Sequence, residues 1–359
     1  MTTTDVSTHD TIPTQDGPAQ GAGDVVLAVK DLTVSFPTEE GEVKAVTTLS
    51  YEARLGRTLA IVGESGSGKS VSSMAVLGLH NPKRSTITGS IKLDGQELVG
   101  ASRAEFQKIR STKVAMVFQD PQSSLHPFYK VGAQIAEAYR AHHKVSKSVA
   151  NKRAVEMLDL VGIPTPERRA LQFPHEFSGG MRQRAMIALG LVNDPKLLIA
   201  DEPTTALDVT VQAQIIDLIK DMQREFGSAV ILITHDLAVV AEVADDILVM
   251  YGGRGVERGA AKEVLSQPAH PYTYGLLQSV PSTSNVTDEL KAIRGAPPSL
   301  LSLPSGCSFH PRCDFMDQVG EPCWTIVPEW RAAPGMANRQ IRCHLEDPVK
   351  TLQEDEGTR

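Results

Sequence analysis

The sequence predicts an α/β fold built around a largely parallel sheet. Five short runs are apolar throughout, as is typical of strands buried on both faces of a sheet, at 59–62, 114–118, 197–200, 230–234 and 247–251. Helical patterns separate these runs, and the one at 209–227 ends in the glycine that often closes a helix. The 359 residues suffice for one large or two smaller domains with a substantial core.

The composition is that of an ordinary globular protein. Hydrophobic residues make up 41% of the chain and charged residues 22%. The net charge of -7 argues against a protein that binds nucleic acid over its whole surface. No apolar window is long enough to cross a bilayer, and the N-terminus lacks a basic flank followed by an apolar stretch. We therefore expect a cytoplasmic location, where thiols stay reduced.

The N-terminal part of the chain divides into a leader and a first strand. Residues 1–24 are rich in Thr, Asp, Gly, Gln and Pro and lack apolar periodicity, so we expect a disordered leader. The stretch VVLAVKDLTVSF, which begins at residue 25, alternates roughly between apolar and polar residues. It predicts a strand of a half-exposed sheet, which would open a domain over 25–265.

Two later segments depart from the strand–helix alternation. Residues from about 120 to 193 contain no apolar strand run, but they place apolar residues at helical spacing, so we expect a helical subdomain inserted in the α/β core. After about 265 the chain becomes rich in proline and weakly periodic. We expect residues 266–359 to form a small irregular C-terminal extension that does not continue the sheet.

The motif GESGSGKS predicts a phosphate-binding loop, with a plain Gly-rich turn as the alternative. It follows the apolar run 59–62 and precedes a helical pattern, so its backbone N–H groups and the helix dipole would face an anion. Lys69 would reach the β- and γ-phosphates of a nucleotide, and Ser70 would ligate Mg²⁺. The nucleotide-binding residues expected here are Gly63, Glu64, Ser65, Gly66, Ser67, Gly68, Lys69 and Ser70.

Two further patterns point to nucleotide hydrolysis. LLIADEP is an apolar strand that ends in two acids, where Asp201 would bind Mg²⁺ and Glu202 would polarise an attacking water. A helix cap after a strand is the alternative reading of these acids. In EFSGGMRQR, Ser178 would cap a helix whose glycine-rich N-terminus could bind a second anion.

The order of these motifs resembles that of ATP-binding-cassette (ABC) ATPases over roughly 25–265. The order is the phosphate loop, Gln119 after a strand, Ser-Gly-Gly, Asp-Glu-Pro, TTALD and ITHD. VGESGSGKS, FQDPQSSLHPF, HEFSGGMRQR and HPYTYGLL look like the dipeptide/oligopeptide importer branch of that family. The resemblance implies a P-loop NTPase core with an antiparallel β subdomain and a helical subdomain.

The resemblance also implies roles for residues around the ATP bound by the chain itself. Glu202 would be the general base, and His235 would contact the γ-phosphate as a switch. Gln119 would contact Mg²⁺, together with Ser70 and Asp201, and would link the site to the helical subdomain. Phe36 would stack on adenine, although an aromatic residue at the end of an apolar strand could equally belong to the core.

A second set of roles implied by the resemblance lies at a dimer seam. ABC ATPases pair head to tail, with each ATP held between the phosphate loop of one subunit and the signature of the other. The signature residues that would contact the partner's ATP are Ser178, Gly179, Gly180 and Met181. The loop that would cross the seam is Ala206, Leu207 and Asp208. Asp208 could also merely cap the next helix.

Two positions depart from the common family pattern. The signature reads Phe-Ser-Gly-Gly-Met where Leu-Ser-Gly-Gly-Gln is usual, so Met181 lacks an amide that could hydrogen-bond. Thr205 stands where serine is common. Neither change removes a catalytic group, so we expect an active ATP hydrolase.

The resemblance implies a transport machine of several chains. The expected partners are a second and different ATPase chain, two membrane permease subunits and an extracytoplasmic substrate-binding protein, with no nucleic acid. The ATPase would lie on the cytoplasmic side of the inner membrane and receive a permease coupling helix near QDPQSSLHPF. The expected cargo is a dipeptide or oligopeptide. The alternative cargoes are a nickel chelate and an oligosaccharide. The alternative functions are a soluble non-transport ABC ATPase and an inactive regulatory subunit.

All four cysteines lie in the C-terminal extension, at Cys307, Cys313, Cys323 and Cys343. Disulfides are disfavoured in a reducing compartment, whereas four thiolates suit zinc or an iron–sulfur cluster. The tails of peptide-importer ATPases look similar, and this resemblance favours a [4Fe–4S] cluster over zinc and over free thiols. A metal centre would also supply folding energy to a segment with little core of its own.

Overall fold

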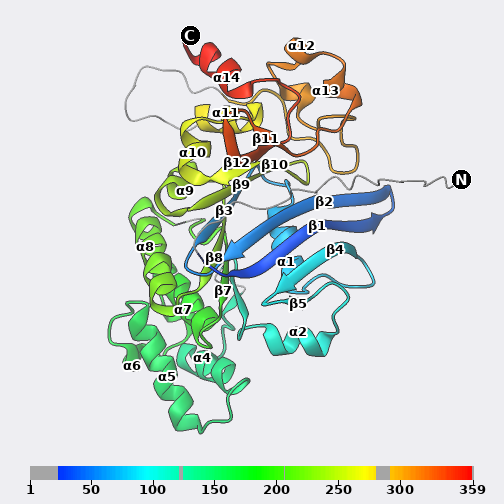
Figure 1. Cartoon of the computed structure of the whole chain (residues 1–359). Helices are drawn as coiled ribbons and strands as arrows, with labels where there is room; N and C mark the ends of the chain where they lie inside the picture. Colours follow the sequence, from blue (N-terminus) through cyan, green and yellow to red (C-terminus); the bar gives the residue numbers. More distant parts are fainter. Residues whose placement is uncertain (1–22, 121–123, 206, 280–291, 358–359) are drawn as a thin grey trace, which may run out of the picture.

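We describe the chain from a computed structural model, which covers residues 23–120, 124–205, 207–279 and 292–357 (Figure 1). Residues 1–22 of the expected leader and Ala206 of the expected seam loop lie outside these described residues. The described strands form two sheets, a four-stranded one with the order β2-β1-β4-β5 and an eight-stranded one with the order β11-β12-β10-β9-β3-β8-β7-β6. Within the described ranges, no helix is both long and apolar enough to cross a membrane.

The middle of the larger sheet is parallel and buried on both faces. Its five parallel strands coincide with the five apolar runs, which confirms these predicted strands. They are β3 (Thr58–Val62), β6 (Val114–Val117), β7 (Leu197–Asp201), β8 (Ala229–Thr234) and β9 (Asp246–Tyr251). Since the carboxyl ends of parallel strands share one sheet edge, the polar residues that follow β3, β7 and β8 meet there.

The smaller sheet is antiparallel and packs with its apolar side on the larger one. It contains β1 (Val25–Thr38), β2 (Gly41–Arg54), β4 (Thr86–Leu93) and β5 (Gln96–Glu97). Leu27 and Leu49 of this sheet share one buried cluster with Ile61 and Ile231 of the other. The helices α1 (Lys69–Val76) and α2 (Arg103–Ile109) belong to the same part of the chain.

A helical region follows β6, as the apolar spacing predicts. It contains α4 (Val131–Arg140), α5 (Lys147–Leu160), α6 (Pro166–Arg169), the 3₁₀ helix η1 (Pro174–Glu176) and α7 (Gly179–Leu191). Ser146 caps α5 by accepting a hydrogen bond from the N–H of Val149 at 3.3 Å. Figure 1 shows α4, α5 and α6 at the end of the molecule opposite the C-terminal segments.

The chain returns to the sheet and then enters its C-terminal part. The described helices from residue 209 onward are α8 (Val209–Phe226), α9 (Leu237–Val243), α10 (Ala261–Ser266), α11 (Pro271–Gln278), η2 (His310–Arg312), α12 (Met316–Val319), α13 (Pro322–Thr325) and α14 (Pro348–Gly357). Gly227 ends α8 in the left-handed conformation, with φ of 62°, as expected from the sequence. The last strands are β10 (Arg254–Ala260), β11 (Arg331–Ala333) and β12 (Met336–Ile341).

The expectation that the C-terminal extension does not continue the sheet is wrong. Strand β12 pairs antiparallel with β10, and β11 pairs with β12, so the extension adds two strands to the edge of the larger sheet. The pattern of β12 hides this role, because one of its two fully buried side chains is Arg339. Arg339 is buried beside Glu257 of β10, with which it forms an ion pair in which both side chains are 0% exposed.

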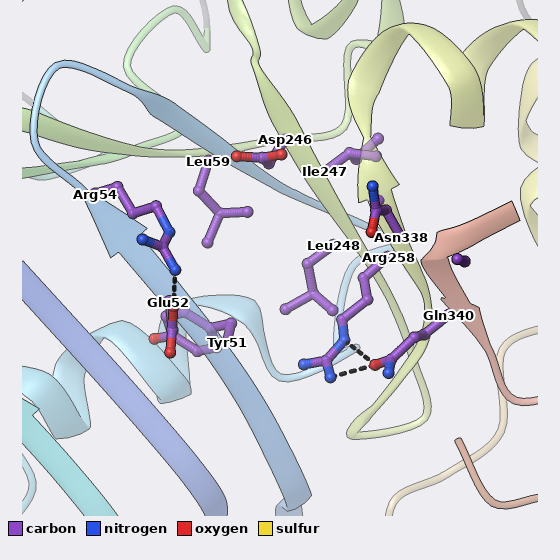
Figure 2. Close-up of a pocket in the computed structure, with 12 residues that line it drawn as sticks. Tyr51, Glu52, Arg54, Leu59, Asp246, Ile247, Leu248, Arg258, Asn338 and Gln340 are labelled. Atoms are coloured by element: carbon purple, nitrogen blue, oxygen red, sulfur yellow. Dashed lines mark hydrogen bonds and ion pairs between the residues drawn. The ribbon is translucent and has the colours of Figure 1, made fainter. Parts of the chain in front are cut away.

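Several polar contacts fix this junction between β10 and β12. The N–H groups of Ala269 and His270 donate to the Glu257 carboxylate at 2.9 and 3.1 Å, so the buried charge has further partners. A small hollow of about 100 Å³ lies beside the junction, and Figure 2 shows Arg258 in it, pointing toward Gln340 of β12. Because the phosphate loop does not line this hollow, we do not assign it to the nucleotide.

Candidate nucleotide site

The phosphate loop joins β3 to α1 in a conformation that requires glycine. Gly63, Gly66 and Gly68 have φ of 155°, 78° and 98°, which are values that other residues rarely adopt. A Cβ atom on Gly63 would lie 2.2 Å from the Met250 carbonyl oxygen, and one on Gly68 would lie 2.3 Å from that of Ala45. The loop is therefore wedged against β2 and β9, and the strand–loop–helix arrangement is the one predicted from the motif.

Lys69 lies buried over this loop. Its Nζ donates to the carbonyl oxygens of Gly63 at 2.7 Å and Glu64 at 3.0 Å. Burial lowers the pKa of Lys69, and the nearby carboxylates of Glu202 and Asp201 partly offset that effect. The ammonium group is thus placed to exchange loop carbonyls for phosphate oxygens when a nucleotide enters.

Ser70 and Asp201 form a small oxygen-rich site beside the loop. The Ser70 hydroxyl donates to Asp201 Oδ1 at 3.0 Å, although the two residues lie 131 positions apart. Burial raises the pKa of Asp201, and its bond to Ser70 acts in the opposite direction. Carboxylate and hydroxyl oxygens are the donors that Mg²⁺ prefers, so this pair fits the ion expected from the sequence.

Glu202 occupies a strained backbone conformation at the end of β7. Its φ of 46° is unusual for a residue with a side chain, and a hydrogen bond of 2.9 Å from its N–H to the Ile233 carbonyl holds it there. Gln119 Nε2 donates to its carboxylate at 3.0 Å, and the Thr205 hydroxyl donates at 2.9 Å. His235 Nδ1 lies 3.6 Å from the other carboxylate oxygen. The structure thus gathers Gln119, Glu202 and His235 from three separate motifs.

Two family models match separate stretches of the chain. The model described as ABC transporter matches residues 46–205, and the one described as Oligopeptide/dipeptide transporter, C-terminal region, matches residues 256–319. The oligopeptide transport ATP-binding protein OppD of Bacillus subtilis (strain 168) is 53% identical over 82% of this chain and 83% of its own length. The chain belongs to the ATP-binding proteins of the oligopeptide/dipeptide ABC transporter family. The family expected from the motif order is thereby confirmed.

Other proteins extend this comparison. The dipeptide transport ATP-binding protein DppD of Bacillus subtilis (strain 168) is 51% identical over 90% of this chain and 95% of its own length. A solved dimeric structure of an ATP-binding cassette, in a post-hydrolysis state bound to ADP and Pi, is 28% identical. It aligns with a TM-score of 0.59 and covers 66% of this chain and 98% of the other. Membership of the family makes this chain an ABC ATPase that hydrolyses ATP to drive transport.

The signature of this ABC ATPase lies beside its expected seam loop. Ser178 caps α7 by accepting a hydrogen bond from the N–H of Met181 at 3.3 Å, as predicted. A Cβ atom on Gly179 would lie 3.9 Å from Leu207, and one on Gly180 would lie 2.9 Å from Val211. Over the described part of the chain, these contacts go to α8 and the loop before it and not to the phosphate loop. Ser178 and Gly179 are exposed.

Two residues at the site have more than one structural role open to them. Asp208 caps α8, because its Oδ1 accepts a hydrogen bond from the N–H of Val211 at 2.9 Å. Phe36 is half-buried, packs against the cluster under the smaller sheet and meets the His80 ring edge-on, with centroids 5.4 Å apart. The structure thus contains the alternative for each residue, a helix cap for Asp208 and core packing for Phe36. The role of Asp208 at the dimer seam and that of Phe36 at adenine stay predictions.

The four cysteines come together in the extension as free thiols. The N–H of Cys307 donates to the Cys323 carbonyl at 2.8 Å, and Cys313 and Cys343 pack against one cluster around Phe315. Burial raises the pKa of Cys307 to about 11 and those of Cys313 and Cys343 to about 12. Among the described residues, however, no group of three or more His, Cys, Asp or Glu side chains is arranged to hold a metal ion. The structure thus does not show the expected metal site.

Sequence reasoning missed two residues that hold the site. Thr205 stands where serine is common, and its hydroxyl donates to Glu202, a contact that its position three residues after the acid could have indicated. Tyr272 belongs to the motif HPYTYGLL, and its hydroxyl accepts a hydrogen bond from the N–H of Glu64 at 2.8 Å. The sequence offers no signal for the second contact, because 208 positions separate the partners.

Proposed function

We propose that this ABC ATPase energises the uptake of dipeptides or oligopeptides through separate permease subunits. The observation that carries the cargo assignment is the match of residues 256–319 to the C-terminal region of oligopeptide/dipeptide transporters. The names of the relatives point the same way. We place the ABC domain at 25–265, with the helical subdomain at about 120–193, and the extension at 266–359.

Hydrolysis would depend on groups that the structure already holds together. The N–H groups of 63–70 and Lys69 would bind the phosphates, while Ser70, Gln119 and Asp201 would hold Mg²⁺, which neutralises charge on the phosphate oxygens when bound. Glu202 would accept the proton of the attacking water, and Gln119 and Thr205 fix its carboxylate by hydrogen bonds. His235, which is 65% exposed at its side chain, would contact the γ-phosphate.

The site would be completed by a second ATPase chain, for which a different chain is our choice. Ser178, Gly179, Gly180 and Met181 would contact the ATP held by that partner, and Ala206, Leu207 and Asp208 would cross the seam. Val209, directly after this loop, is 83% exposed, which is unusual for a large apolar side chain and supports burial by a partner.

A permease coupling helix would dock on the helical subdomain near QDPQSSLHPF. In support, Phe128 is 82% exposed and Tyr129 is 60% exposed. Gln134 holds this loop by donating to the carbonyls of His126 and Tyr129 at 3.0 and 2.9 Å, so the aromatic side chains have a fixed support. The ATPase would lie peripherally on the cytoplasmic side of the inner membrane, and an extracytoplasmic binding protein would deliver the cargo.

The cargo can be tested on the assembled transporter. The tagged chain is purified from its own cells in mild detergent, and the co-purifying subunits are identified and reconstituted into liposomes with internal ATP. We expect uptake of labelled dipeptides and longer peptides. Uptake of a nickel chelate or an oligosaccharide in place of peptides would contradict the cargo, and the absence of permease subunits would contradict transport.

We also infer that Cys307, Cys313, Cys323 and Cys343 bind a [4Fe–4S] cluster, with zinc as the alternative. Four unpaired thiols in one region support a soft metal centre, and the extension has only small buried clusters of its own. The centre would act as a structural staple. Protein prepared without oxygen should contain iron and acid-labile sulfide. Zinc without iron would favour the zinc site. The absence of both iron and zinc would contradict both assignments.

A further inference from the structure

An arginine of the C-terminal extension binds the phosphate loop. Arg312 of η2 donates from Nη1 to Glu64 Oε2 at 2.6 Å and from Nη2 to Glu64 Oε1 at 3.0 Å. Glu64 is the second residue of the loop, and 248 positions separate it from Arg312. Two parallel hydrogen bonds between a guanidinium and a carboxylate fix the orientation of both groups, as well as their separation.

Arg312 is held rigidly on its own side of this contact. Its side chain is only 5% exposed, and its Nε donates to the Arg294 carbonyl at 2.8 Å. Its Nη1 lies 3.3 Å from the Tyr251 hydroxyl, and the guanidinium lies 5.7 Å from the centroid of the Tyr251 ring. A guanidinium that is fixed in this way loses little freedom when it binds Glu64, so the contact constrains the loop.

Glu64 connects Arg312 to Lys69. Its carboxylate is bound by Arg312, its N–H donates to Tyr272, and its carbonyl oxygen accepts from Lys69 Nζ at 3.0 Å. Two of these three contacts come from outside the loop, and the third leads to the group that would bind the phosphates. A displacement of Glu64 therefore changes both the direction of the loop N–H groups and the position of Lys69.

We propose that Arg312 is a positioning residue for ATP hydrolysis, which holds the phosphate loop in the conformation that receives ATP and Lys69 in the place from which it moves to the phosphates. The inference rests on the proposed phosphate site at 63–70. Arg312 also directly precedes Cys313, so a rearrangement of the thiol region reaches the ATP site through this side chain. If Arg312 served only to dock the extension, its loss would change the unfolding of the chain but not its ATP parameters.

The test compares ATP binding and hydrolysis in the complete transporter. Arg312→Met should raise the KM for ATP about tenfold or more, because hydrogen bonds to charged groups have this magnitude, while kcat falls less. Arg312→Lys, which keeps the charge but not the fork, should give an intermediate KM. Arg153→Met is the matched control, since Arg153 forms a guanidinium–carboxylate contact of 2.5 Å with Asp194 in the helical region, and it should leave KM within about twofold.

Variants on the loop side keep the test decisive if Arg312→Met does not fold. Glu64→Gln removes the charge from a side chain that is 25% exposed and should also raise KM. The exchange Glu64→Arg with Arg312→Glu should recover part of the affinity lost in either single variant. Unchanged KM in both Arg312→Lys and Glu64→Gln, with normal ATP binding by the wild type, would overturn this inference alone. A wild type that binds no ATP would overturn the phosphate site as well.

Discussion

At Glu202, a strained backbone and a fixed carboxylate occur in the same residue. A left-handed conformation costs a residue with a side chain about 1–3 kcal/mol, so the surrounding hydrogen bonds must maintain it. The N–H of Glu202 is bound to Ile233, while Gln119 and Thr205 both donate to one carboxylate oxygen. The second oxygen lies 3.6 Å from His235 Nδ1, and in the proposed mechanism it would accept the proton of the attacking water.

Replacing Glu202 with glutamine tests the proposed base. Glu202→Gln keeps the size of the side chain but cannot accept the proton, so we expect kcat to fall at least about 100-fold while ATP still binds. Steady-state hydrolysis and equilibrium nucleotide binding measure the two effects. Glu225→Gln makes the same chemical change on the exposed face of α8 and should leave both unaltered. Full turnover by Glu202→Gln would show that another group is the base.

At the scale of single elements, buried polar pairs attach the extension to the ABC domain. Strand β12 presents Arg339 to Glu257 of β10, and helix α11 is capped by His270, whose Nδ1 accepts from the N–H of Tyr272 at 3.0 Å. Two guanidinium groups pack on the Trp330 ring, that of Arg258 at 5.0 Å and that of Arg342 at 4.9 Å from its centroid. Of these contacts, the Arg339–Glu257 pair and the packing of Arg258 on Trp330 join the extension to β10 of the larger sheet.

Loss of Arg339 should detach β12 from the sheet. Arg339→Met leaves the Glu257 carboxylate buried without its counter-ion, so we expect the free energy of unfolding to fall by about 3–5 kcal/mol. Urea titration followed by fluorescence measures this, because both tryptophans of the chain, Trp324 and Trp330, lie in the extension. The double variant with Glu257→Gln should recover part of the loss. Unchanged stability of Arg339→Met would refute the role of the pair.

His270 should make the structure sensitive to acid. Burial lowers the pKa of His270 from 6.5 to about 3, so the folded chain keeps it neutral while the unfolded chain protonates it below pH 6.5. Its contribution is therefore complete above pH 6.5 and is lost as the pH falls toward 3, by about 2 kcal/mol between pH 6.5 and 5. His270→Asn, which can still cap α11, should flatten this part of the stability profile. An unaltered profile would contradict the assignment.

At the scale of the whole molecule, the proposed ATP site lies between the helical region and the C-terminal extension. Figure 1 shows the helical region at one end and the extension at the other, with the sheets between them. Gln119 connects the site to the helical region through its bond to Glu202, and Arg312 connects it to the extension through Glu64. Each region can have more than one conformation. ATP binding can therefore shift the populations of these conformations if the affinity for ATP differs between them.

The proposed coupling surface can be separated from hydrolysis. Phe128 is 82% exposed and is not one of the residues proposed for ATP binding or hydrolysis. Phe128→Ser should therefore leave ATP hydrolysis intact while peptide uptake falls at least about tenfold. Uptake and hydrolysis are measured on the same liposomes. Val25→Ser, at a 39% exposed apolar residue of β1, is the matched control and should transport normally. Normal uptake by Phe128→Ser would place the permease contact elsewhere.

The parallel strands, the phosphate loop, the acids at the end of β7 and the family can all be predicted from the sequence. Apolar runs and fixed spacings carry these features, and both act over short stretches of chain. Three features become visible only in the folded chain: β11 and β12 join the sheet, Thr205 holds Glu202, and Arg312 reaches the phosphate loop. The physical reason is that a buried charge has the sequence pattern of an exposed residue until its partner is placed. The partner of Arg339 is 82 positions away and that of Arg312 is 248 positions away.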